Sequence, residues 1–335
     1  MIAPFGTIAA NAVIAAARGQ PLVTDILIMA GLLVVFGIAA EFISKGTEKF
    51  EDVMGQGMAG GVILGLMAAL PETIFVIIAV AEGAYAVAVG TALGGNIILF
   101  TLGIGLVAVA YFAKWKKGIT MKEDYHIEIA FLIAATLALL ILLVYGRLDA
   151  ASGVLLILLY VSYVVYRYTK VHSRIMRHVA TEKGRREFLE GVLLMAIGSA
   201  IVALFSSAFI ATIIGIAGTA GIAAVWLALV IAPIASDFEE QLAAYRLTQR
   251  SQRGGSTAIV SFIGGKLENN TVLLGIIGIF AASPVYIGFA APELIAVMVI
   301  NTIAITILSR GRLTYMQGAV LILLYFATIT AAFVA

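Results

Sequence analysis

The chain has 335 residues, of which 62% are hydrophobic and only 12% are charged. Soluble domains are about half apolar and one quarter charged, so this composition excludes an ordinary soluble protein and predicts an all-α protein that crosses a membrane many times. The net charge of +2 says little until the charges are placed on loops, and the lack of cysteine excludes a disulfide framework and a thiolate metal site.

The apolar residues fall into ten segments, each with about the 20 residues that a helix needs to cross a bilayer. Residues 1–20 are also apolar, but no Lys or Arg precedes that run, which favours a short exported or interfacial segment over a cleaved signal peptide. In chain order, the predicted spans are 23–43, 57–81, 86–112, 125–145, 150–168, 190–213, 221–247, 256–281, 286–308 and 313–334.

Lysine and arginine are concentrated in every second loop. Eighteen of the 21 follow the first, third, fifth, seventh and ninth spans. Basic loops stay in the cytoplasm, so these loops are predicted to be cytoplasmic and both chain termini to lie outside. The longest basic stretch, 169–189, is predicted to be a cytoplasmic linker, either a plain solvated loop or a segment attracted to anionic membrane lipids.

This linker divides the chain into two halves of five spans each, residues 1–168 and 190–335. Because five is an odd number, a duplicated unit of five helices enters the membrane upside down in the second half. The expected fold is therefore an all-α membrane protein of ten transmembrane helices, arranged as two inverted-topology repeats of five.

The second span carries an acid in its interior, Glu72, directly after Pro71. Proline removes a backbone donor and interrupts the helix, and an acid at mid-membrane costs about 2.5–3.5 kcal/mol. Free carbonyl groups at that depth persist only where they line a cavity. These features favour an intramembrane cation site over the alternative, an acid that pairs with a neighbouring helix only for assembly.

The seventh span carries a matching acidic cluster at 236–240, and Glu240 lies 168 residues after Glu72. A glycine pair follows each acid: Gly94-Gly95 begins 22 residues after Glu72, and Gly264-Gly265 begins 24 residues after Glu240. Small residues let membrane helices approach closely. The pairs would thus bring the third and eighth spans against the spans that carry the acids.

Four membrane segments, two from each half, therefore hold the candidate ligands. Hard cations such as Ca²⁺ take about six to eight oxygen ligands from carboxylates, amides, carbonyls and water. Facing carboxylates repel one another, so the same groups can hold protons when the metal leaves. The predicted metal-binding set is Glu72, Asn96, Ser236, Asp237, Glu239, Glu240, Glu268 and Asn269, with Thr73 and Asn270 as further neutral oxygens.

The motifs Leu70-Pro71-Glu72 and 90–97 (Gly-Thr-Ala-Leu-Gly-Gly-Asn-Ile) resemble the first signature repeat of the calcium/cation antiporter superfamily, a Pro-Glu helix break followed by Gly-Ser-Asn-Ile. Residues 236–240 and 264–270 are similar to its second repeat, in degenerate form. The resemblance implies ten helices in two inverted halves with ion sites between them, and exchange of Ca²⁺ against Na⁺ or H⁺ by alternating access. It also implies an integral protein of a prokaryotic cell membrane.

Carried over by position, Glu72 and Glu240 resemble the paired metal-binding glutamates of the family, although Glu239 or Asp237 could take the second role. Asn269 stands where the family's ligand in the eighth span is often Asp. Ala68 and Ala69 occupy positions where Na⁺-coupled members carry hydroxyls. Gly95 and Gly265 stand where serine is usual, and Leu99 stands where a second amide is common. Since these changes remove neutral oxygens and keep carboxylates, protons are favoured over Na⁺ as the counter-ion, with Na⁺/Ca²⁺ exchange as the alternative.

Lys266 lies deep in the eighth span, about 15 Å along the helix from its start. We expect it to pair with an acid, either Glu268, Glu239 or Asp237. Two roles stay open. The lysine is either one half of a structural ion pair, or its ammonium fills space that a bound cation takes in other members.

An enzyme of a different class, acting within the membrane on lipid phosphate or peptide, would need a metal motif or a nucleophile–base pair. The sequence has no HExxH motif and no convincing pair. We therefore expect a transporter and not an enzyme, with Ca²⁺ and H⁺ or Na⁺ as its cargo, no resident cofactor and no nucleic-acid partner. A passive cation channel is a further alternative, and the oligomeric state stays open.

Overall fold

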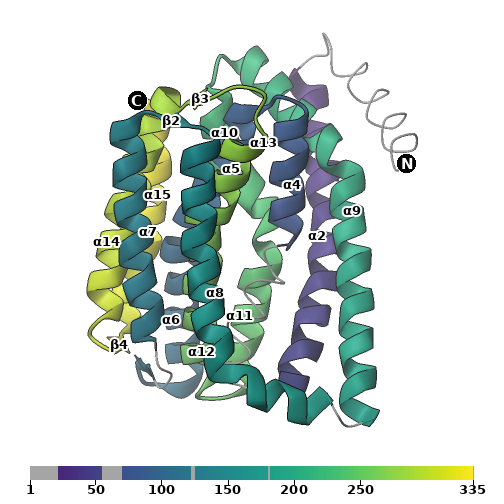
Figure 1. Cartoon of the computed structure of the whole chain (residues 1–335), viewed down its shortest axis with the longest axis vertical. Coiled ribbons are helices and arrows are strands. Elements are labelled where there is room, and N and C mark those ends of the chain that lie inside the picture. Colours follow the sequence, from purple (N-terminus) through teal and green to yellow (C-terminus); the bar gives the residue numbers. More distant parts are fainter. Residues whose placement is uncertain (1–21, 55–69, 122–124, 180–181, 335) are drawn as a thin grey trace.

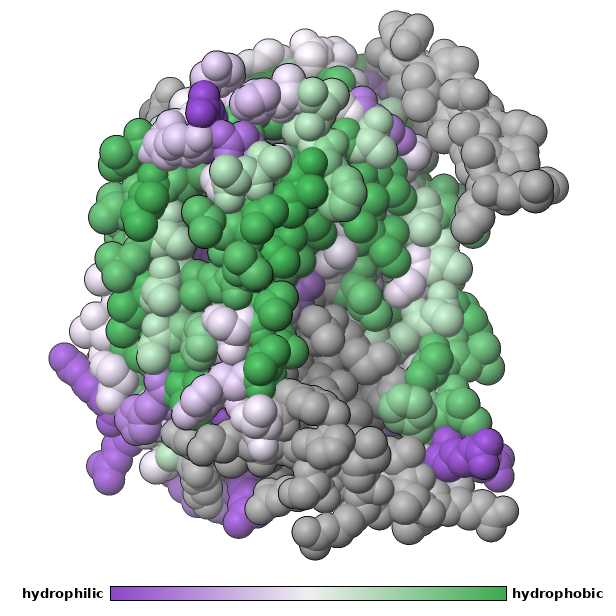
Figure 2. Space-filling model, in the orientation of Figure 1, coloured by the Kyte–Doolittle hydropathy of each residue, from purple (hydrophilic) through white to green (hydrophobic). Residues whose placement is uncertain are grey.

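A computed structural model of the chain describes residues 22–54, 70–121, 125–179 and 182–334. Nearly all of these residues are helical, and the helices run side by side along the long axis of the bundle (Figure 1). The visible surface is apolar around its middle and polar toward both ends (Figure 2). A helical bundle with an apolar belt is typical of a membrane protein. The lipid interior offers no water to the backbone N–H and C=O groups, and a helix pairs these groups with one another.

Six helices of the described part are long and apolar enough to cross a membrane. They cover 22–49, 85–115, 126–145, 150–167, 184–220 and 287–308. The predicted interfacial segment 1–20 and the first part of the predicted second span, 57–69, lie outside the described residues.

The first half of the chain contributes five helical spans or parts of spans. The third is one continuous helix that contains a π-helical segment, η1. The elements are α2 (Leu22–Met54), α4 (Leu70–Ala81), α5 (Tyr85–Ile98), η1 (Leu99–Gly103), α6 (Ile104–Trp115), α7 (His126–Tyr145) and α8 (Ala150–Val179).

The second half follows the same order, and its third long helix again contains a π-helical segment, η2. The elements are α9 (Glu182–Ala220), α10 (Ala224–Ser236), α11 (Phe238–Arg250), α12 (Gly254–Glu268), η2 (Asn269–Leu273), α13 (Leu274–Phe280), the 3-10 turn η3 (Ile287–Ala290), α14 (Ala291–Leu308) and α15 (Tyr315–Val334).

Two details differ from the expectations drawn from the sequence. Much of the basic stretch 169–189 is helical and not a loop, because α8 continues to Val179 and α9 begins at Glu182. The stretch contains a single glycine and no proline to end a helix. The all-helical expectation also missed four short strands, β1 (Ile119–Thr120), β2 (Arg147–Leu148), β3 (Val285–Tyr286) and β4 (Arg312–Leu313).

Contacts between elements recur in matched pairs. The α4 helix packs on α9 while α11 packs on α2, and α6 packs on α15 while α13 packs on α8. The strands follow the same rule, because β1 pairs with β4 and β2 pairs with β3, both antiparallel. In these pairs, the contact of a first-half element has a counterpart in which the two halves exchange roles.

The two π-helical segments also occupy matching places. Both begin five residues after the first glycine of a Gly-Gly pair, at Leu99 and at Asn269, and these positions are 170 residues apart. Single π-helical turns inside α-helices are frequent at functional sites. This match gives a residue-by-residue correspondence between the two long helices, and it places their interruptions next to the candidate ligands.

Candidate cation site

The seventh predicted span is broken at its acidic cluster. The α10 helix, which contains Pro233, ends at Ser236, and α11 begins at Phe238. Asp237 lies between the two helices, and Glu240 lies in the first turn of α11. Both carboxyl groups are buried, as is Glu72 near the beginning of α4. Acids from both halves therefore lie in the interior of the bundle and not at its surface.

Three polar groups converge on Gly95 of α5. A methyl group at this glycine would overlap the side-chain amide of Asn269 and would lie 2.8 Å from Glu72 Oε1 and 2.9 Å from Asp237 Oδ2. On the opposite long helix, a methyl at Gly265 would lie 3.1 Å from both carboxylate oxygens of Glu240. Each of these glycines makes room for site groups. Gly94 instead lets the α10 backbone approach closely, since a methyl there would overlap the Leu229 carbonyl.

Glu72 and Asp237 lie within hydrogen-bonding reach of each other. Asn269 adds a donor: with its amide nitrogen turned toward these acceptors, it reaches Glu72 Oε2 at 3.1 Å and the Gly265 carbonyl at 3.0 Å. Ser236 Oγ donates to Asp237 Oδ1 at 3.3 Å. Groups from α4, α10, η2 and the break at Asp237 therefore meet at one place.

Two carboxylate oxygens of this group have no donor. Asp237 Oδ2 and Glu240 Oε1 are buried and accept no hydrogen bond from the described residues. A buried acceptor without a partner costs free energy, and a buried charge costs more. These oxygens require a proton or a cation. In the conformation described, no three carboxylate or imidazole side chains of the described residues are close enough together to coordinate one metal ion.

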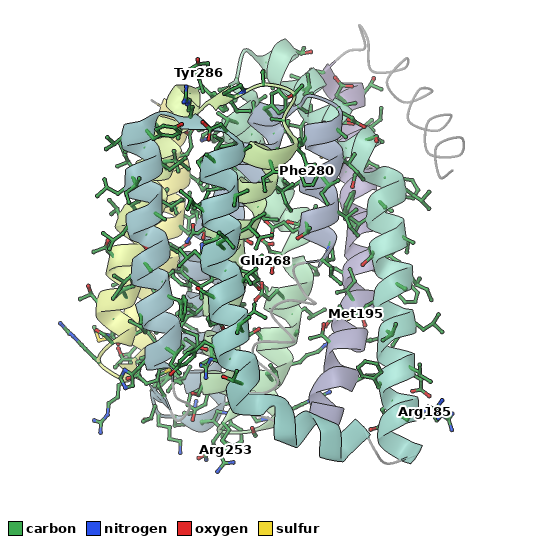
Figure 3. All side chains as sticks on the ribbon, in the orientation of Figure 1. Arg185, Met195, Arg253, Glu268, Phe280 and Tyr286 are labelled. Atoms are coloured by element: carbon green, nitrogen blue, oxygen red, sulfur yellow. The ribbon has the colours of Figure 1, made fainter. Side chains whose placement is uncertain are left out.

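Glu268 differs from these acids because both of its oxygens have donors. Thr73 Oγ1 donates to Oε1 at 3.0 Å and the Tyr160 hydroxyl donates to Oε2 at 3.1 Å. Glu268 lies about midway along the bundle (Figure 3). These bonds connect Glu268, at the junction of α12 and η2, to α4 and α8. Sequence reasoning missed Tyr160, because it lies in an uninterrupted apolar span.

Lys266 is fully buried. The predicted ion pair with Glu268 or Asp237 is wrong, because neither acid forms a salt bridge with it. Its Nζ donates to the Gly95 carbonyl at 3.3 Å and lies 4.8 Å from the centre of the Phe100 ring. The long side chain extends to α5 and η1. It forms no salt bridge with Glu268, which lies two residues further along the chain. Glu239 belongs to α11, and its side chain lies outside the described part of the structure.

The amides of the long helices also present free oxygens. Asn96 Nδ2 donates to the Ala92 carbonyl at 2.9 Å, and its Oδ1 is buried with no donor among the described residues. Asn270 is buried with neither of its side-chain polar atoms bonded there. Both residues can supply neutral oxygen ligands to a cation.

A sequence profile of the sodium/calcium exchanger protein matches residues 24–169 and 190–334, most of the chain. The chain belongs to this family. The predicted membership in the calcium/cation antiporter superfamily is thereby confirmed, and the chain is an integral membrane protein of an exchanger family, which transports ions and is not a family of enzymes. The matched ranges fall on either side of the basic stretch.

Solved exchanger structures share the fold. A crystal structure described as the H⁺/Ca²⁺ exchanger CAX has a TM-score of 0.72 and 19% identity, covering 98% of this chain and 92% of that one. The sodium-calcium exchanger NCX_Mj, soaked with 100 mM Na⁺ and 10 mM Sr²⁺, has a TM-score of 0.66 and 16% identity, covering 93% and 99%. No curated protein matches the chain in sequence. At these identities the structures show a shared fold and not a shared cargo.

Proposed function

We propose that this family member is a secondary antiporter that moves Ca²⁺ across the membrane in exchange for protons by alternating access. The observation that carries the proposal is the pair of buried, donorless oxygens, Asp237 Oδ2 and Glu240 Oε1, beside Glu72. Oxygen atoms of this kind suit a hard divalent cation, and carboxylates also bind protons.

Coupling follows from the cost of burying charge. When Ca²⁺ leaves the cluster, Glu72 and Asp237 face each other without a cation in a low-dielectric interior. One proton shared between them removes part of that repulsion, and another satisfies Glu240. A site that holds neither Ca²⁺ nor protons therefore costs too much free energy for the protein to switch its access from one side of the membrane to the other. This cost makes the exchange obligatory and distinguishes this protein from a passive channel.

The architecture that we propose is ten transmembrane helices in two inverted repeats, 1–168 and 190–335, joined by the basic linker 169–189. The matched contacts between the halves and the equal placement of η1 and η2 support it. The charges of the loops favour an orientation with the linker in the cytoplasm and both termini outside. The family resemblance favours the cell membrane of a prokaryote. We expect contacts with membrane lipids and no resident cofactor or nucleic-acid partner.

Na⁺ is the second candidate counter-ion. The observation that favours it is the pair of amides, Asn96 and Asn270, whose oxygens have no donor among the described residues. Neutral oxygens of this kind build Na⁺ sites. Against it stand Gly95 and Leu99, where other family members carry hydroxyl and amide groups according to the resemblance in sequence.

The test is Ca²⁺ flux in proteoliposomes under separately imposed pH and Na⁺ gradients. We expect a pH gradient at constant Na⁺ to drive Ca²⁺ uptake, and Glu72→Gln to abolish it. The control is Glu82→Gln, which makes the same chemical change at an exposed position in the turn after α4. Flux driven only by the Na⁺ gradient would favour the second candidate, and full activity of Glu72→Gln would overturn the proposal.

A further inference from the structure

Lys266 occupies the position that corresponds to Asn96 in the other half. The glycine pairs and the π-helical segments are each offset by 170 residues, and the same offset leads from Asn96 to Lys266. At this position the first half presents an amide oxygen with no donor among the described residues, whereas the second half presents an ammonium group. Where the first half could supply a ligand to a cation, the second half thus carries a cationic side chain.

The surroundings of the ammonium are those that a small monovalent ion would need. A backbone carbonyl, Gly95 O, accepts from it, and the face of Phe100 lies beneath it. The charges of Asp237, Glu72 and Glu240 act on it. Carbonyl oxygens, carboxylates and aromatic faces all stabilise compact cations. Because no single acid of the described residues forms a salt bridge with it, the ammonium serves the whole cluster and not one partner.

Among the described residues, no single acid pairs with this lysine and explains it as a structural group. A lysine held only for structure would be expected to pair with one acid, as Arg167 does with Glu128 between α7 and α8. Glu268 is close in sequence, but it takes its hydrogen bonds from Thr73 and Tyr160 instead. The positive charge is therefore available to the carboxylates that lack donors.

We propose that Lys266 is a built-in monovalent cation of the exchanger. Its ammonium occupies a position in the carboxylate cluster that would otherwise bind Na⁺ or a similar ion, and it thereby excludes monovalent metal ions from the transport cycle. This inference deepens the proposed function and rests on exchange at the same carboxylates. It assigns the choice between the two counter-ions to one side chain.

The test compares three substitutions in the full-length purified protein. Lys266→Asn places at 266 the amide that the other half has at 96, and Lys266→Met removes the charge and adds no oxygen. Lys266→Arg keeps the charge. Binding of radioactive Na⁺ is measured with and without Ca²⁺. We expect wild type and Lys266→Arg to bind no Na⁺, and Lys266→Asn to gain Na⁺ binding that Ca²⁺ displaces, with Lys266→Met weaker.

The transport assay gives a second readout. At equal pH on both sides, a Na⁺ gradient should drive Ca²⁺ flux at least about tenfold faster in Lys266→Asn than in wild type, because removal of one buried charge changes the affinity for a cation strongly. Na⁺ binding by wild type, or well-folded Lys266→Asn and Lys266→Met proteins that neither bind nor use Na⁺, would overturn the inference.

Loss of the ammonium also leaves acids uncompensated, so the neutral variants could unfold. The inference then predicts that Na⁺, but not choline, raises the thermal stability of Lys266→Asn, since an ion that binds only the folded state stabilises it. The double variant Lys266→Met with Asp237→Asn removes one charge of each sign. It should fold without Na⁺ and bind none. If Na⁺ fails to stabilise Lys266→Asn while the double variant folds, the inference is wrong.

These outcomes are separate from those of the proposed function. Na⁺ binding by the purified variant requires no transport, so it can be measured even if wild type moves no Ca²⁺. Conversely, Ca²⁺/H⁺ exchange by wild type combined with unchanged ion dependence in all three variants would retain the proposed function and remove Lys266 from it.

Discussion

The two long interrupted helices, α5–η1–α6 and α12–η2–α13, have the same backbone plan and different chemistry. Each carries a Gly-Gly pair and then a π-helical segment at the same spacing. In the first, the residues at and around the start of η1 are Ile98, Leu99 and Phe100, all buried and apolar. In the second, the corresponding residues are Glu268, Asn269 and Asn270.

The two long helices therefore share a backbone shape but not the chemistry of their side chains. The first long helix supplies packing surface, the Gly95 carbonyl, the Asn96 amide and the aromatic face beneath Lys266. The second supplies an acid, two amides and the lysine. Each half still gives one buried glutamate from the preceding span, Glu72 and Glu240. Both halves therefore contribute to the cluster, and the second half contributes more of its polar groups.

The strongest test of this difference between the two long helices is to substitute one glycine in each. Gly95→Ala places a methyl within 3 Å of Asn269, Glu72 and Asp237, so we expect it to abolish Ca²⁺ transport while the protein still reaches the membrane. For Gly265→Ala, the three nearest atoms all belong to the Glu240 carboxyl group, at 3.1 Å or more, and this one side chain can rotate away. We therefore expect partial activity.

The control for both is Gly37→Ala in α2, where a methyl would meet nothing within 4 Å. Initial rates of Ca²⁺ uptake, normalised to the amount of reconstituted protein, give the ranking. Equal loss in Gly95→Ala and Gly265→Ala would show that the two long helices contribute equally to the site, against the asymmetry argued above.

A second comparison concerns two acids at the third residue of corresponding helices, Glu128 in α7 and Glu293 in α14. Glu128 forms a fully buried salt bridge with Arg167 of α8, and the Tyr163 hydroxyl also donates to it at 3.3 Å. Glu293 is buried with no salt bridge among the described residues. Removal of one partner from a buried pair leaves an uncompensated charge, which costs about 3–5 kcal/mol.

We therefore expect Arg167→Met to lower the unfolding temperature in detergent strongly, and Glu293→Gln to change it little. The double variant Arg167→Met with Glu128→Gln should recover much of the loss, because no charge is then left buried. Equal stability of Arg167→Met and wild type would contradict the role given to this pair.

The smallest expected effect concerns the starts of α8 and α15, which use the same reciprocal capping with different residues. Asp149 Oδ1 accepts from the Ser152 N–H at 3.0 Å, and Ser152 Oγ accepts from the Asp149 N–H at 2.9 Å. At α15, Thr314 and Gln317 make the equivalent bonds with neutral side chains. Only the first cap should depend on pH.

Hydrogen bonds from the Ser152 N–H and the Tyr145 hydroxyl lower the pKa of Asp149 to about 2. Because this pKa is below the usual value, the ionised carboxylate stabilises the folded state above about pH 4, and this contribution is lost as the pH falls through about 2. The difference in unfolding temperature between wild type and Asp149→Asn should thus shrink toward low pH. The difference for Thr314→Ala should stay constant, and parallel behaviour of the two variants would contradict the comparison.

The sequence predicted the features that depend on local composition. Apolar runs of helical length predicted where the described helices lie, and an acid after a proline identified Glu72 as an interior group. Three features escaped it for physical reasons. The helical continuation of 169–189 has no apolar periodicity that marks a membrane span, and the π-helical segments have no composition of their own.

The third feature is the set of long-range contacts, which only the fold determines. Tyr160 lies in an apolar span, and nothing near it in sequence indicates its bond to Glu268. The same holds for Lys266, whose neighbour in sequence is an acid but whose actual partners lie on α5 and η1. The roles of the candidate residues as metal ligands stay predictions.

The central claim is that acids from both halves hold one cation together. The most direct measurement is Ca²⁺ binding to the purified protein by equilibrium dialysis at neutral pH, for wild type, Glu72→Gln and Asp237→Asn. Because Glu72 and Asp237 lie against each other across the two halves, the account predicts that either substitution alone abolishes binding. Wild-type affinity in either variant would contradict it.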